Sequence, residues 1–133
     1  MNNSKAYKIV AKFNRDTKEG KIVWSITREK PSSLSGSENL IDDVFVTQVL
    51  EKKLRLYRFQ YKSYYDEDIY EWVDKYRLEF VGIWGNSEWT FPYEMPIFDL
   101  YESVRYKVSN IDKFMEDFLG DDEGEESSNL NLF

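Results

Sequence analysis

Two long segments in the middle of the chain alternate aromatic and polar residues, which is the pattern of half-buried β-strands. In the first segment, one face carries Arg55, Tyr57, Phe59, Tyr61 and Tyr65. In the second segment, one face carries Tyr70, Trp72, Tyr76, Leu78 and Phe80. A two-residue turn at Asp66 and Glu67 predicts a hairpin in which Tyr61 pairs with Trp72 and Lys62 with Glu71.

Three shorter segments predict further strands before this hairpin. They cover residues 7–13, 21–27 and 44–50. Residues 14–20 are polar and predict a hairpin loop between the first two of these strands. Residues 29–43 are rich in serine and have no periodicity, so they predict a long mobile loop. A Gly-Asn-Ser turn between Trp84 and Trp89 predicts a last, short hairpin.

After Pro96 the apolar residues recur at intervals of three and four, which is typical of amphipathic helices. The first apolar stripe consists of Ile97, Leu100, Tyr101, Val104 and Val108. The second consists of Ile111, Phe114, Met115, Phe118 and Leu119. Asn110 is the expected cap of the second helix, and Gly120 is its expected end.

Strands that are followed by helices, instead of alternating with them, indicate the α+β class. We expect an antiparallel, strongly curved sheet of about six strands, followed by two C-terminal helices packed on one face. A partly open barrel is the variant to expect if the long central strands coil. The length of 133 residues suits one domain, here residues 1–120, followed by an acidic C-terminal tail at 121–133.

The charge balance limits the kinds of partner. With 25 acidic and 18 basic residues the formal net charge is −7. Residues 120–133 hold five acids and no base, which leaves 20 acids against 18 bases, or −2, for the rest. An acidic chain repels a phosphate backbone, so we expect no nucleic-acid partner. Neither a signal stretch nor a window of roughly 18 apolar residues is present, so we expect a cytoplasmic protein without membrane contact.

The chain contains no cysteine and no histidine. Catalytic triads with an imidazole base, thiol nucleophiles and most zinc sites are therefore excluded. The densest acidic group in the body is Asp66, Glu67 and Asp68, with Glu71 nearby, but it lacks the spacing and the glycine of a calcium-binding loop. A solvated hairpin turn is the favoured interpretation. We expect a protein without enzymatic activity, cofactor or metal.

Two groups of residues are candidates for binding. The first is an aromatic sheet face composed of Tyr57, Phe59, Tyr61, Trp72 and Tyr76. Such rings anchor protein contacts or stack on planar ligands, although burial of the same face under the C-terminal helices is the favoured interpretation. The second lies in the tail, where Leu130, Leu132 and Phe133 alternate with asparagine and could dock as an extended strand on a sheet edge.

These observations favour a non-catalytic protein–protein interaction module: an adaptor, an inhibitor or an accessory subunit of a larger effector, for example in bacterial antiviral defence or another bacterial or phage conflict. The partner and the oligomeric state stay open. An alternative is a ligand-binding sheet or barrel with an aromatic-lined cavity. A third hypothesis is a carboxylate-based hydrolase that uses Glu71 with Asp74, or Glu94 with Asp99.

Overall fold

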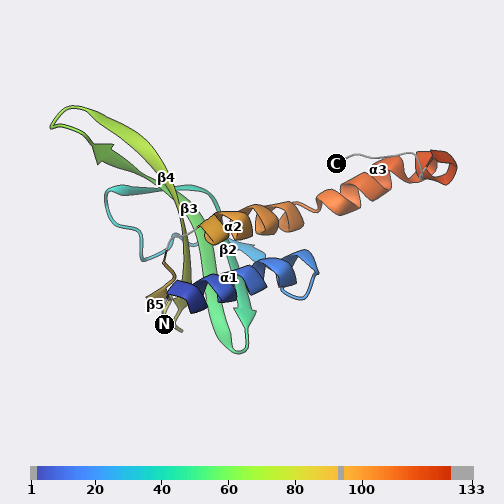
Figure 1. Ribbon diagram of the computed structural model, residues 1–133, viewed down its shortest axis with the longest axis horizontal. Coiled ribbons are helices and arrows are strands. Elements are labelled where there is room, and N and C mark those ends of the chain that lie inside the picture. The colour runs from blue at the N-terminus through green and yellow to red at the C-terminus, as the bar shows by residue number, and fades with distance from the viewer. Residues whose placement is uncertain (1–2, 93–94, 127–133) are drawn as a thin grey trace.

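The computed structural model describes residues 3–92 and 95–126. Within them the chain forms one open, antiparallel sheet in the order β1-β2-β3-β4-β5, with helices at both ends of the sequence (Figure 1). The strands are β1 Ser25–Thr27, β2 Glu38–Val49, β3 Lys52–Tyr64, β4 Tyr70–Val81 and β5 Ser87–Thr90. The helices are α1 Asn3–Lys18, α2 Met95–Val108 and α3 Ile111–Glu126. The α+β class with an antiparallel sheet is confirmed, with five strands where the sequence predicted about six.

The predicted first strand, residues 7–13, was wrong because these residues belong to α1. The residues that α1 buries are Ala6, Val10, Phe13 and Thr17, which recur every three or four positions along the helix. The period is not obvious in the sequence because its last member, Thr17, is polar. The buried Thr17 hydroxyl is satisfied, because it accepts a hydrogen bond from the indole nitrogen of Trp24 at 3.0 Å. The predicted loop at 14–20 is largely the last part of the same helix.

Two further boundaries also differ from the prediction. Of the predicted strand at 21–27, only Ser25–Thr27 is extended. The predicted loop at 29–43 ends early because β2 already begins at Glu38. A bulge interrupts β2 between Ile41 and Phe45, where Asp42 has a φ of 60°. The bulge explains why this part of the strand has no regular alternation.

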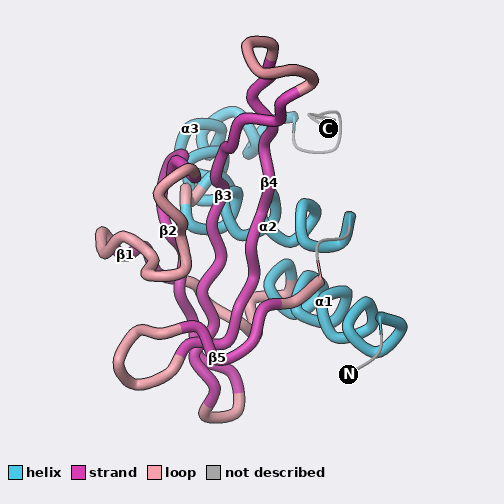
Figure 2. Tube along the Cα trace, turned by 90° about the vertical axis from the view of Figure 1, so that its left-hand side faces the viewer, coloured by secondary structure: helices cyan, strands magenta, loops and turns pink. Residues whose placement is uncertain are grey.

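Helices α1 and α2 lie side by side on one face of the sheet (Figure 2). The stripe predicted for α2 is confirmed, since Ile97, Leu100, Tyr101 and Val104 are all buried in the main core. From the sheet, Leu54, Leu56 and Leu78 meet these helices and are fully buried. This core holds the body of the protein together.

The third helix, α3, departs from the prediction in two ways. It continues the direction of α2 away from the sheet and contacts little besides the end of α2, so only one of the two C-terminal helices packs on the sheet (Figure 1). It also passes through Gly120 and ends at Glu126, which makes the first part of the predicted acidic tail helical. The predicted docking residues Leu130, Leu132 and Phe133 lie outside the described residues. None of the three helices, as far as they are described, is long and apolar enough to cross a membrane.

Candidate binding surface on the β3–β4 hairpin

The pairing of β3 with β4 determines which side chains share a face. Tyr61 lies opposite Val73, and Lys62 lies opposite Trp72. The predicted pairing of Tyr61 with Trp72 was therefore wrong by one residue, because the turn is longer than two residues. Side chains alternate between the two faces of a strand, so a shift of one residue moves every ring of β4 to the other face relative to β3.

The five rings of the predicted aromatic face are consequently divided between two faces. Tyr57 and Phe59 lie on the face away from the helices, where both are buried, and Tyr61 packs beside them. Trp72 and Tyr76 lie on the helix face. Tyr76 is covered by α2, with its ring centroid 4.9 Å from that of Tyr101. Of the five, Trp72 alone is strongly exposed, at 47%.

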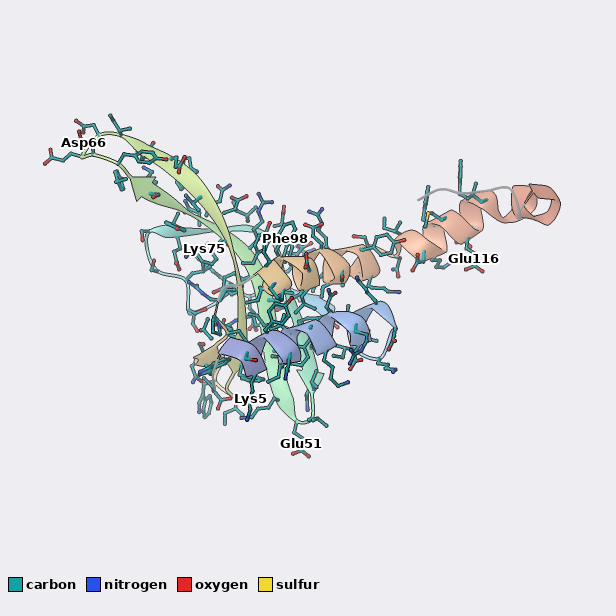
Figure 3. All side chains as sticks on the ribbon, viewed as in Figure 1. Lys5, Glu51, Asp66, Lys75, Phe98 and Glu116 are labelled. Carbon is teal, nitrogen blue, oxygen red and sulfur yellow. The ribbon has the colours of Figure 1, made fainter. Side chains whose placement is uncertain are left out.

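The part of the hairpin that carries Trp72 extends beyond the rest of the sheet (Figures 1 and 2). The pairing of β2 with β3 ends at Tyr61, and β5 pairs only with residues 79–81 of β4. Residues 62–72 therefore form a two-stranded ribbon, which we call the arm. Figure 3 shows Asp66 at its tip, at the opposite end of the sheet from Glu51.

One face of the arm consists of Lys62, Tyr64, Tyr70 and Trp72, which we call the arm face. Its rings contact one another, with centroids 5.4 Å apart for Tyr64 and Tyr70 and 6.2 Å apart for Tyr70 and Trp72. The ammonium group of Lys62 lies 4.4 Å from the centroid of Tyr70 and 5.4 Å from that of Trp72. Tyr64 and Tyr70 nevertheless remain 58% and 43% exposed. The arm face is thus a cluster of rings that is held in place and still accessible.

Sequence reasoning did not assign Tyr64 and Tyr70 to the candidate site. The signal that could have found them is their symmetric position on either side of the turn, where they pair directly. Using it requires the correct turn length. That length is set by Tyr65 and Ile69, whose backbone groups bond across the turn at 2.8 Å.

A polar group separates the arm face from the core. Asp74 accepts hydrogen bonds at 2.6 Å from Gln60 and at 2.6 Å from Arg58. These bonds, with that of Gln60 the larger influence, lower the pKa of Asp74 below its usual value although partial burial opposes the shift. Arg58 also reaches Asp42 in the β2 bulge at 3.6 Å. The base of the arm is therefore tied to the neighbouring strand.

The opposite face of the arm carries a hydrogen-bonded pair in place of a ring cluster. The Tyr65 hydroxyl donates a hydrogen bond to the Glu71 carboxylate, which raises the pKa of Tyr65.

The carboxylate pairs proposed for a hydrolase do not face each other. Glu71 and Asp74 lie on opposite faces of β4, so they do not converge on one substrate. For the other proposed pair, Asp99 is exposed on α2 and Glu94 lies outside the described residues. Among the described residues, no group of three carboxylates is placed to hold a metal ion.

A second polar cluster lies under the loop between β1 and β2, on the face away from the helices. Glu79 is fully buried and accepts hydrogen bonds from the Arg55 Nε at 2.6 Å and from the Ser33 hydroxyl at 2.9 Å. Ser33 and Arg77 each lie 2.7 Å from the Tyr57 hydroxyl. Burial raises the pKa of Tyr57, although its hydrogen bonds with Ser33 and Arg77 partly oppose this shift.

This cluster connects the loop to the sheet. Besides Glu79, Arg55 also bonds the backbone carbonyl of Gly85 at 3.1 Å, and Ser32 bonds the same carbonyl at 2.9 Å. The bonds run from the loop to β3, to β4 and to the turn before β5, so they hold these parts together. The sequence did not indicate the cluster because its members are far apart in the chain.

Comparisons of the chain with protein-family models, with curated proteins and with solved structures found no match.

Proposed function

We propose that this protein is a non-catalytic protein-binding module, an adaptor, inhibitor or accessory subunit, that contacts its partner through the arm face. The observation that carries the proposal is the exposure of Tyr64, Tyr70 and Trp72 together on a hairpin that extends beyond the core. Rings in the core stabilise the fold, but these three contact mainly one another and Lys62. Their position is better explained by a contact with another molecule.

The physical properties of the arm face support protein binding. Tyrosine and tryptophan are enriched among the residues that dominate binding energies at protein interfaces. Mutual ring contacts restrict the side chains before binding, so less conformational entropy is lost when a partner orders them. Lys62 adds a positive charge beside the rings, which favours a partner with a carboxylate next to an apolar patch.

The alternatives have less support. A ligand-binding barrel requires a closed sheet, whereas this sheet is open between β1 and β5. Tyr57 and Phe59 pack against Leu34, Leu40 and Val44 instead of lining a cavity. A carboxylate-based hydrolase requires two acids that face each other, and Glu71 and Asp74 do not.

The test is affinity capture from the source cell with the full chain and two variants. The first variant is Tyr70→Ala with Trp72→Ala, which removes most of the arm face. The matched control is Trp84→Ala, because Trp84 is 88% exposed on the turn before β5, at the other end of the sheet. The arm variant is expected to lose the partner that the wild type and Trp84→Ala retain.

With the purified partner, calorimetry should show at least ~30-fold weaker binding for the arm variant, which corresponds to about 2 kcal/mol. Circular dichroism should show the fold intact in both variants. Equal capture by the arm variant and the wild type would refute the proposal. Loss of the partner in Trp84→Ala alone would move the binding site to the other end of the sheet.

A further inference from the structure

Helix α3 presents an apolar surface that nothing in the described chain covers. Phe114 is 62% and Phe118 is 73% exposed, and their rings stack on each other with centroids 5.6 Å apart and an interplanar angle of 9°. Isolated helices of about 15 residues are marginally stable in water, and helices in proteins gain most of their stability by packing an apolar face. A helix of 16 residues with such a face is therefore expected to lie against another surface.

The charge of α3 narrows the choice of that surface. The sequence of Ile111–Glu126 contains eight acids and one lysine, a net charge of −7. Of the 25 acids and 18 bases in the chain, 17 of each remain elsewhere. The whole net charge thus belongs to α3, and the rest of the molecule is neutral. A second α3 is a poor partner because the two helices would repel each other.

The same chain contains a surface of the opposite charge on α1. This helix carries five bases and one acid, Asp16, and therefore has a net charge of +4. The bases are Lys5, Lys8, Lys12, Arg15 and Lys18. They are exposed and recur every three or four residues, so they form one basic stripe on the side away from the sheet. With 16 residues each, α1 and α3 are both about 24 Å long.

A groove adjoins the basic stripe at the base of α3. It has a volume of about 860 Å³ and lies where the end of α1, the end of α2 and the start of α3 meet. Its lining holds three bases, Lys18, Arg105 and Lys107, and one acid, Glu102, so its net charge is positive. Tyr106 and Ile111 add apolar surface to the same groove. It can therefore accept a helix that is both acidic and apolar.

We propose that α3 of one molecule docks on the basic α1 stripe and the adjoining groove of a second copy, while the second copy does the same in return. Within one molecule α3 points away from α1, as Figure 1 shows and as Glu116 illustrates in Figure 3. When each copy docks its α3 on the α1 of the other, the Phe114–Phe118 pairs of both copies are buried. Each acidic helix then lies against a basic one. Such a reciprocal contact closes as a two-fold dimer. This dimer is independent of the arm face and of its partner.

The test uses charge reversal in the full chain, followed by sedimentation velocity. The α1 variant is Arg15→Glu with Lys18→Glu, and the α3 variant is Glu116→Lys with Asp117→Lys. The first variant lowers the net charge of α1 from +4 to 0, and the second changes that of α3 from −7 to −3. Each variant alone therefore loses attraction in both contacts, and its dimer should dissociate at least ~10-fold more readily than that of the wild type. In a mixture of the two variants, the unaltered α3 of the first meets the unaltered α1 of the second, so one wild-type contact is restored. A one-to-one heterodimer should therefore form in preference to either homodimer.

Two further measurements accompany the charge reversal. Phe114→Ala with Phe118→Ala should also yield monomers, and added salt should weaken the wild-type dimer. Circular dichroism checks that each variant retains its helices. A wild-type chain that stays monomeric at millimolar concentration overturns the proposal. So does a dimer that is insensitive to both charge reversals, or a mixture of the two variants that stays monomeric.

Discussion

The two halves of the β3–β4 hairpin are built from the same kinds of residue but have different surroundings. In the body, Leu56, Tyr57, Leu78 and Glu79 are fully buried between the helices on one face and the loop between β1 and β2 on the other. In the arm, Tyr64, Tyr70 and Trp72 follow the same alternation and stay exposed. An aromatic strand therefore becomes core or surface according to what packs on it. We expect the body half to determine stability and the arm half to determine binding.

The largest effect should follow from breaking the buried ion pair of the body. Glu79→Ala removes the carboxylate that Arg55 contacts and leaves a buried, uncompensated guanidinium, so the free energy of unfolding should fall by about 3–5 kcal/mol. Urea denaturation measures the change. The control is Arg55→Met with Glu79→Leu, which removes both charges and should cost clearly less. Equal losses in the single and the double variant would contradict this account.

The next effect compares two positions on the same face of β4. Leu78→Ala opens a cavity under α2 and should lower the free energy of unfolding by about 3 kcal/mol. Trp72→Ala, six residues earlier in the strand, should cost about 1 kcal/mol or less because its side chain is half exposed. Thermal denaturation of the two variants side by side checks the difference. Similar losses would mean that the arm is part of the cooperative core.

A smaller effect on the free energy of unfolding should come from the buried Tyr101 of the body at alkaline pH. Burial raises the pKa of Tyr101 to about 12, so between pH 10 and 12 the unfolded state loses a proton that the folded state keeps. Stability should therefore fall as the pH rises through this window, by about 1 kcal/mol at pH 11. Tyr101→Phe lacks this contribution, and its unfolding free energy should decline less over the same window. An identical decline in both proteins would argue against a buried, protonated Tyr101.

The smallest effect is expected at the boundary between the two halves. Asp74→Asn weakens the contacts with Arg58 and Gln60, but the group is partly exposed, so the loss at neutral pH should be about 0.5 kcal/mol or less. Because the pKa of Asp74 is lowered in the folded state, its contribution is present above the usual carboxyl pKa and is lost as the pH falls through the folded value. The wild type and Asp74→Asn should therefore converge in stability at acid pH. If the wild type stays more stable than Asp74→Asn at acid pH, the stabilising contribution does not come from the negative charge of Asp74.

Sequence patterns predicted β3, β4 and α2 well, and α1, β1 and the first half of β2 poorly. The alternation along β3 and β4 and the stripe of α2 extend over enough residues to identify their type. In α1, a window of seven residues fitted a strand, and the helical period is visible only when the window is extended to Ala6 and Thr17. For the candidate site, the sequence pattern grouped Trp72 with Tyr57, and a turn misjudged in length assigned it to the wrong face relative to Tyr57. No local pattern could correct that error, because the register depends on a few turn residues.

By itself, the sequence determined the class of the fold, the absence of thiol and imidazole chemistry, and the concentration of acidic residues near the C-terminus. These properties depend on composition and on periodicity within one segment. The tertiary structure decided which rings are buried, which are presented on the arm, and that nothing in the described part of the chain covers the exposed rings of α3. The physical reason is that burial depends on contacts between segments that are distant in the chain. Periodicity indicates that a strand or helix has an apolar face, but not what covers it.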